Sequence, residues 1–153
     1  SVLVVTEVLP TQAQVCRDVG VGRGERHVLR QHDIDVDDVG VGSLDTKIEN
    51  FVNQRVRIYT MNEKIAPAAR SFAFKNPIIK NQLVFGRKLL RAQITKHFAE
   101  ELSAFEKQQQ QAAVAIIDSL TTFESYDMMR SDQRMSVQAI KSILTESIRK
   151  ALQ

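Results

Sequence analysis

The side chains that could act as acid–base or nucleophilic groups are few in this sequence of 153 residues. The three histidines are His27, His32 and His97, and the single cysteine is Cys16. Histidine has the ordinary pKa that suits proton transfer near neutral pH, and a nucleophilic cysteine needs a base held against it. No carboxylate and nucleophile set stands near His97, and the His and Cys residues lack the spacing of metal ligands. We therefore predict that the protein is not an enzyme and binds no metal and no cofactor.

Composition is that of an ordinary globular chain. Apolar residues make up 43% of the sequence, which suffices for a core, and the formal net charge is only +3. A small positive charge is weak evidence for a nucleic-acid partner. A single cysteine permits no intramolecular disulfide, and the apolar residues 1–8 are too few to span a membrane. We expect a cytoplasmic protein without membrane association.

The composition changes at about residue 43. All nine aromatic residues lie at or after Phe51, and five of the six glycines lie between Gly20 and Gly42. Residues 1–43 carry four Arg against seven Asp or Glu. Residues 33–42 alternate Val or Ile with Asp or Gly, which favours a loop or disorder over a strand. The sequence thus predicts an N-terminal segment at 1–43 and a domain at 44–153.

From Leu44 onward apolar residues recur at the three- and four-residue spacing of helices. The spacing predicts a helix that ends before Pro67, a second helix that Asn76 caps, a third over about 106–130 and a last one that Ser136 caps. Residues 87–153 contain neither Gly nor Pro, which favours long helices. The predicted fold is an all-α bundle. The first three apolar faces comprise Ile48, Phe51, Val52, Val56 and Tyr59; Ile79, Leu83, Gly86, Leu90, Ile94 and Phe98; and Ile116, Leu120 and Phe123.

Residues 112–152 resemble the C-terminal end of many regulators of the tetracycline-repressor (TetR) family. In the most specific stretch, 118–130, Asp118-Ser-Leu-Thr-Thr is followed by Phe-Glu-Ser-Tyr-Asp and then by Met-Met-Arg130. That order is similar to the family's run of an Asp-x-Leu-Thr-Ser-like start, an aromatic, Glu, a small residue, an aromatic, an acidic residue and an apolar pair before Arg. The turn Pro67-Ala-Ala-Arg70 is similar to one near the start of the family's sensing domain. The resemblance covers residues 44–152.

Residues 11–30 are similar to the helix-turn-helix of the same family, whose second helix reads the major groove. Five residues match in place: Val15, Cys16, Val19, Gly20 and Val21. Glu25, however, stands where the family has a phosphate-contacting Thr, and DNA repels its charge. The candidate DNA contacts are Arg23, Arg26 and His27. Three interpretations stay open: a degenerate motif, a segment that is not coding sequence in its proper frame, and a loop with chance similarity.

The resemblance implies a ligand-responsive transcriptional regulator of the repressor type. A small apolar molecule bound in the helical domain would control binding of operator DNA by a homodimer, and this chain is expected to have lost tight operator binding. The implied ligand pocket is lined by Tyr59, Met61, Phe72, Phe85, Leu89, Phe123 and Tyr126. The implied dimer interface, on the last helix, comprises Val137, Ile140, Leu144 and Ile148. The alternative is a helical interaction module without a ligand, which an absence of any cavity of about 300–1,000 Å³ would favour.

Overall fold

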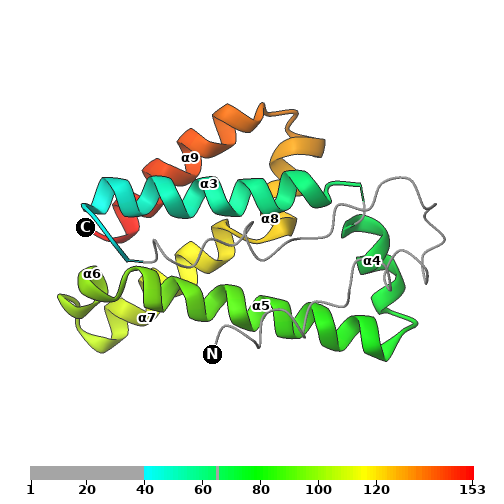
Figure 1. Cartoon of the computed structure of the whole chain (residues 1–153), viewed down its shortest axis with the longest axis horizontal. Helices are drawn as coiled ribbons and strands as arrows, with labels where there is room; N and C mark the ends of the chain where they lie inside the picture. Colours follow the sequence, from blue (N-terminus) through cyan, green and yellow to red (C-terminus); the bar gives the residue numbers. More distant parts are fainter. Residues whose placement is uncertain (1–39, 65) are drawn as a thin grey trace. The chain divides into compact units, whose positions relative to one another are not determined.

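The computed structural model describes residues 40–64 and 66–153, all of whose regular elements are helical (Figure 1). Within these residues the all-α prediction is confirmed. The candidate DNA contacts Arg23, Arg26 and His27 lie outside the described residues. The elements are α3 (Leu44–Asn62), α4 (Ala66–Ala73), α5 (Pro77–His97), α6 (Ala99–Ser103), α7 (Lys107–Leu120), α8 (Phe123–Asp127), the π-helical η2 (Met128–Asp132) and α9 (Val137–Ala151).

The chain divides into two compact units. The described part of the first unit comprises the end of α3 from Thr60, then α4, and α5 as far as Leu89. The described part of the second unit comprises residues 40–59 and 90–153. These units differ from the two regions expected from composition, and the boundary at residue 43 stays a prediction.

The ends of α3, α4 and α5 confirm the local signals in the first unit. α3 ends at Asn62, before Pro67, which lies in the first turn of α4. A proline is tolerated there because the first helical N–H groups have no partner within the helix. The side chain of Asn76 accepts hydrogen bonds from the backbone N–H groups of Ile78 and Ile79 at the start of α5, as the sequence predicted.

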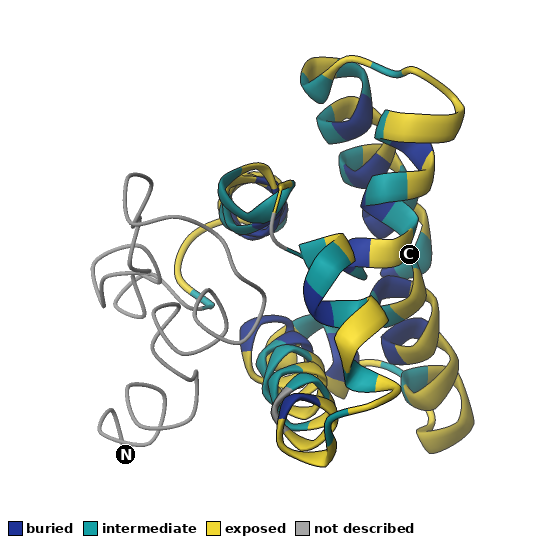
Figure 2. Cartoon of the chain, turned by 90° about the vertical axis from the view of Figure 1, so that its right-hand side faces the viewer, coloured by how far each residue is buried: buried dark blue, intermediate teal, exposed yellow. Residues whose placement is uncertain are grey.

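The apolar faces of the helices form the core of the second unit (Figure 2). On α3, the face predicted from Ile48 to Tyr59 is buried throughout. On α5 and α7, Ile94 and Ile117 are fully enclosed. α7 packs against α9, and the spacing of their buried residues is the one by which a helix covers a core with a single face.

The single helix expected over 106–130 is wrong: the chain forms α7, α8 and η2 there. The break falls at Thr121 and Thr122, where hydroxyl side chains compete with the helical backbone pattern. The Thr122 hydroxyl accepts from the backbone N–H of Ser125 and so caps α8. Ser125 in turn donates to the carbonyl of Ser119 at 2.6 Å. Hydrophobic spacing continued across the break, so it did not reveal these caps.

The final helix begins as predicted. The Ser136 hydroxyl accepts a hydrogen bond from the backbone N–H of Ala139, and α9 then runs from Val137 to Ala151. At its far end Arg149 pairs with Asp45 at 2.9 Å, which fixes the end of α9 beside the first turn of α3. The whole of α9 thus belongs to the second unit.

Candidate functional site

Three of the seven expected pocket residues form an aromatic cluster in the second unit. The ring centroid of Tyr59 lies 5.7 Å from that of Phe123 and 5.6 Å from that of Tyr126. The rings of Phe123 and Tyr126 are 6.1 Å apart, and all three side chains are buried. The Tyr59 hydroxyl donates to the carbonyl of Thr121 at the end of α7. The cluster therefore joins α3 to α8 and to the break between α7 and α8.

The other four expected pocket residues belong to the first unit. Met61, Phe85 and Leu89 are half-buried, and Phe72 is exposed. The described ring contacts therefore bring together only Tyr59 on α3 with Phe123 and Tyr126 on α8.

Most of the residues expected at the dimer interface lie in the core of the chain itself. Ile140, Leu144 and Ile148 are buried by the chain itself, and Val137 is half-buried. A side chain enclosed in its own core offers no surface to a partner. The exposed apolar residue of α9 is Ile143, which the sequence analysis did not select.

One face of α7 carries an exposed apolar stripe that could contact another helix. Ile116 is 48% exposed, and Ala112 and Ala115 on the same face are also exposed. These residues are three and four positions apart, so they form one stripe. Because Ala112 and Ala115 are small, another helix could approach the α7 backbone closely.

The core of the second unit contains a guanidinium. Arg55 on α3 is 1% exposed, and its Nη2 donates to the backbone carbonyl of Leu90 at 2.6 Å. Its Cζ lies 4.8 Å from the centroid of the Phe51 ring, one helical turn earlier. The Nε and Nη1 atoms are buried and have no hydrogen-bond partner among residues 40–64 and 66–153. Burial lowers the pKa of Arg55, but a guanidinium remains charged at any ordinary pH.

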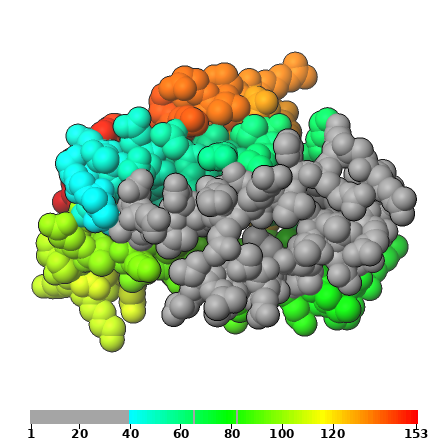
Figure 3. Space-filling view, in the orientation of Figure 1, coloured from blue at the N-terminus to red at the C-terminus, as the bar shows by residue number. Residues whose placement is uncertain are grey.

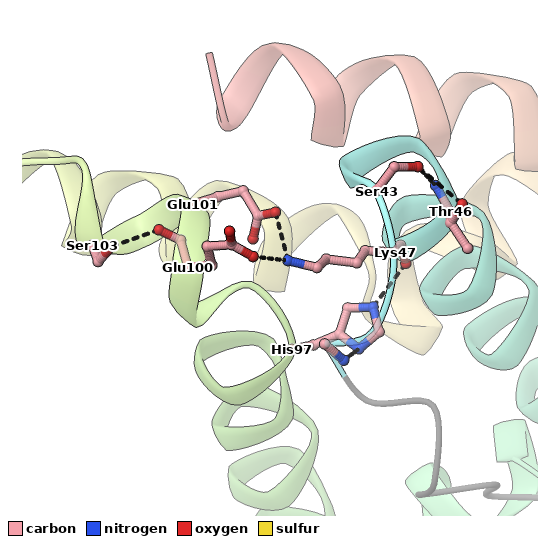
Figure 4. A network of polar contacts seen from close by, with 8 residues as sticks. Ser43, Thr46, Lys47, His97, Glu100, Glu101 and Ser103 are labelled. Carbon is pink, nitrogen blue, oxygen red and sulfur yellow. Dashed lines mark hydrogen bonds and ion pairs between the residues drawn. The ribbon is translucent and has the colours of Figure 1, made fainter.

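A second buried cation on the same face of α3 has full compensation. Lys47 is 2% exposed, and its Nζ donates to Glu100 at 2.7 Å and to Glu101 at 2.8 Å (Figure 4). The hydrogen bonds that Lys47 donates to these carboxylates raise the pKa of Lys47, and the same bond to the ammonium lowers the pKa of Glu100. The start of α3, cyan in Figure 3, accordingly lies against the yellow-green segment that contains α6.

His97 completes this contact as a neutral imidazole. Its Nδ1 accepts from the backbone N–H of Gly40 at 3.1 Å, so Nε2 carries the proton and donates to the carbonyl of Lys47 at 2.7 Å. Burial is the main cause that lowers the pKa of His97. Gly40 has a φ of 75°, and a Cβ there would lie 3.3 Å from the His97 carbonyl oxygen, so this approach requires glycine. The imidazole acts as a structural link between the start of α3 and the end of α5.

Neither Lys47 nor Arg55 was selected from the sequence, although a signal was present. Both occupy the apolar face of α3, four residues before and four residues after Phe51. Charged residues at core positions of a helix indicate buried cations that need partners. Spacing alone did not distinguish Lys47, which pairs with two carboxylates, from Arg55, which pairs with none of the described ones.

A surface groove of about 450 Å³ lies where the end of α5, α6 and α7 meet in the second unit. Its polar lining includes Arg91, Thr95 and Gln110, and its apolar lining includes Leu102 and Val114. None of the seven expected pocket residues lines it. Arg91 is committed to an ion pair with Asp118 at 2.7 Å. The groove is therefore a shallow surface feature and not the aromatic pocket that the resemblance implied.

The described residues offer neither a metal site nor a membrane-spanning helix. No group of three or more His, Cys, Asp or Glu side chains in 40–64 and 66–153 is arranged to hold a metal ion. Of the helices in that part of the chain, none is both long enough and apolar enough to cross a membrane.

Comparison of the chain with protein-family models, with curated proteins and with solved structures gave no match. The function is therefore inferred from the residues and their contacts. The features of the second unit that carry it are the aromatic cluster, the buried Arg55 and the exposed apolar face of α7.

Proposed function

We propose that the protein is a ligand-responsive regulator of the TetR type, in which the second unit contains sensing and dimerising elements. A small molecule with an apolar body binds among the helices, and its binding shifts α3, which directly follows the N-terminal segment. Such a switch requires a ligand that binds one arrangement of the helices better than the other.

The observation that carries this proposal is the contact of Tyr59 with Phe123 and Tyr126. It connects the helix next to the N-terminal segment with the stretch 118–130, on which the resemblance to the TetR family mainly rests. A displacement of α8 is transmitted to α3 because packed aromatic rings cannot deform gradually. The cluster thus supplies the physical link that a sensor needs between its ligand and its output.

The chain offers a direct test, because Tyr59 and Tyr126 are its only tyrosines and it has no tryptophan. Selective isotope labelling of tyrosine therefore gives NMR signals from this cluster alone. A small-molecule library is first screened by thermal unfolding, and compounds that stabilise the protein are added to the labelled sample. We expect both tyrosine signals to shift. If stabilising compounds leave both signals unchanged, or if none of the library binds, the sensor proposal fails.

The proposed assembly is a homodimer through α7 and α9. Its apolar contacts are Ile116 with its neighbouring alanines and Ile143, in place of the buried residues of α9. A stable interface commonly buries more than about 1,200 Å² in total. Light scattering at micromolar concentration should show a dimer that Ile116→Glu and Ile143→Glu convert to a monomer. Ile78→Glu, at an isoleucine of the first unit that is 68% exposed, should leave the dimer intact. A monomeric wild-type chain would contradict this assembly.

Operator binding by this chain is proposed to be weak. Residues 1–43 carry more acidic than basic side chains, and phosphate contacts supply most of the affinity of a DNA-binding segment. Selection from a random DNA pool at physiological salt should enrich no sequence. A specific gel shift at nanomolar protein would overturn this part of the proposal.

A second candidate is a helical interaction module without a ligand. The observation in its favour is that Tyr59, Phe123 and Tyr126 fill the space among themselves as an ordinary core does. Under this alternative the dimer persists, while no compound shifts the tyrosine signals. The tyrosine measurement described above therefore separates the two candidates.

A further inference from the structure

Arg55 is a permanent positive charge in the core of the second unit, and no described carboxylate is hydrogen-bonded to it, although the charge of Asp118 acts on it at longer range. Its Nη2 donates to the Leu90 carbonyl, and the donors on Nε and Nη1 are buried without a hydrogen-bond partner among the described residues. Removing an ion from water costs several kcal/mol unless an opposite charge compensates it. The Phe51 ring offers only a weak cation–π contact.

Three carboxylates of the same unit are paired with other cations. Glu100 and Glu101 bind Lys47, and Asp118 binds Arg91 at the surface. On the same helix, the buried positive charge of Lys47 is compensated by two carboxylates. Arg55, two turns further along α3, has the same burial and receives none. No described carboxylate takes this role at Arg55, so its unused donors are free to bind an anion from outside the chain.

We propose that Arg55 anchors a carboxylate ligand inside the second unit, with the ligand's apolar body among the core residues of α3. This inference rests on the proposed sensor function and names its ligand class. A monoanion is favoured because one charge neutralises one guanidinium, whereas a phosphate dianion would leave a buried negative charge. An apolar body is favoured because the flanking side chains on this face, Phe51, Val52 and Val56, are buried hydrocarbon.

Binding at Arg55 has a mechanical consequence. The guanidinium is now enclosed, so a ligand reaches it only if the surrounding helices move. Since Arg55 lies one turn before Tyr59 on α3, that movement reaches the aromatic cluster directly. Binding of the ligand's charge at Arg55 thereby requires the displacement of α3.

The experiment compares carboxylic acids with neutral compounds of the same shape. Octanoate, benzoate, octanamide and benzamide are titrated against the full chain by calorimetry in low-chloride buffer. We expect the acids to bind at least about tenfold more tightly than the amides, as a charge-assisted hydrogen bond to a buried cation allows. Arg55→Met should abolish this preference. Arg91→Met, at the arginine whose side chain is 49% exposed and which pairs with Asp118, should retain it.

A measurement on the wild-type protein removes dependence on the folding of Arg55→Met. The Nε–H signal of Arg55, observed by nitrogen-15 NMR, should shift with octanoate and not with octanamide. Equal binding of acids and amides, an acid preference that survives Arg55→Met, or an unmoved Nε–H signal would overturn the inference. Chloride that produces the same shift and the same stabilisation would identify an adventitious ion only, and would also overturn it.

The test also separates this inference from the function on which it rests. If neutral compounds bind and shift the tyrosine signals while the acids gain no advantage, the sensor function stands and the carboxylate anchor is wrong. If no compound of either kind binds or shifts those signals, both proposals fail.

Discussion

Acidification should loosen the contact between the start of α3 and the end of α5 through His97. The neutral imidazole accepts from the Gly40 N–H and donates to the Lys47 carbonyl. Protonation turns Nδ1 into a donor, so the Gly40 N–H loses its acceptor and a cation is formed in a buried position. The charges of Lys47 and Arg55 oppose that cation, while Glu101 favours it less strongly than burial disfavours it.

The direction of the effect follows from the lowered pKa of His97 in the folded state. The unfolded chain, with a histidine pKa of about 6.5, takes up the proton first as the pH falls. The contribution of His97 to stability is therefore complete above that pH and declines below it, until the folded protein is protonated as well. Because only one proton is involved, this decline cannot exceed about 1.4 kcal/mol per pH unit. The lowered pKa of Glu100 affects stability only at more acidic pH, below the ordinary range of glutamate.

Urea unfolding followed by circular dichroism at pH 7.5 and pH 5.5 measures this change. The wild-type free energy of unfolding should fall by at most about 1.4 kcal/mol between the two pH values, the limit for one group that takes up a proton only in the unfolded chain. His97→Gln, which keeps an acceptor and a donor but does not titrate, should lose most of this dependence. The double variant His27→Gln/His32→Gln should keep it. A wild-type chain equally stable at both pH values, or a dependence unchanged in His97→Gln, would refute the reasoning.

Two further outcomes concern local stabilisation in the second unit. Ser136→Ala should lower the free energy of unfolding by about 0.5–2 kcal/mol because it removes the cap of α9, and Ser142→Ala, at an exposed position within α9, should change it little; equal effects of the two in chemical denaturation would contradict the capping role. Lys47→Met should cost about 1–3 kcal/mol because the partly buried Glu101 carboxylate loses its cation. Adding Glu101→Gln should recover part of that loss, whereas Lys150→Met, at a lysine that is 72% exposed, should cost less than about 0.5 kcal/mol. A double variant no more stable than Lys47→Met alone would exclude the ion pair as the cause.

Local signals in the sequence determined the starts of α5 and α9. Asn76 and Ser136 cap their helices as predicted because a side-chain acceptor satisfies backbone N–H groups within three residues. The buried face of α3 follows from apolar spacing, since a helix of this length must turn one side to a core. The break at Thr122 is also local, but its hydroxyl contacts leave the hydrophobic spacing intact.

The roles of the buried residues were decided only by the tertiary structure. Spacing gave α9 one apolar stripe, but only the packing of α7 against α9 showed that Ile140, Leu144 and Ile148 are used within the chain and that Ile143 stays exposed. Lys47 and Arg55 are equivalent as sequence positions, both cations on the apolar face of α3. They differ because α6 brings two carboxylates to Lys47, more than fifty residues along the chain, and none of the described segments brings one to Arg55. Charge compensation depends on distances of a few ångströms between segments far apart in sequence, and periodicity along one helix contains no information about them.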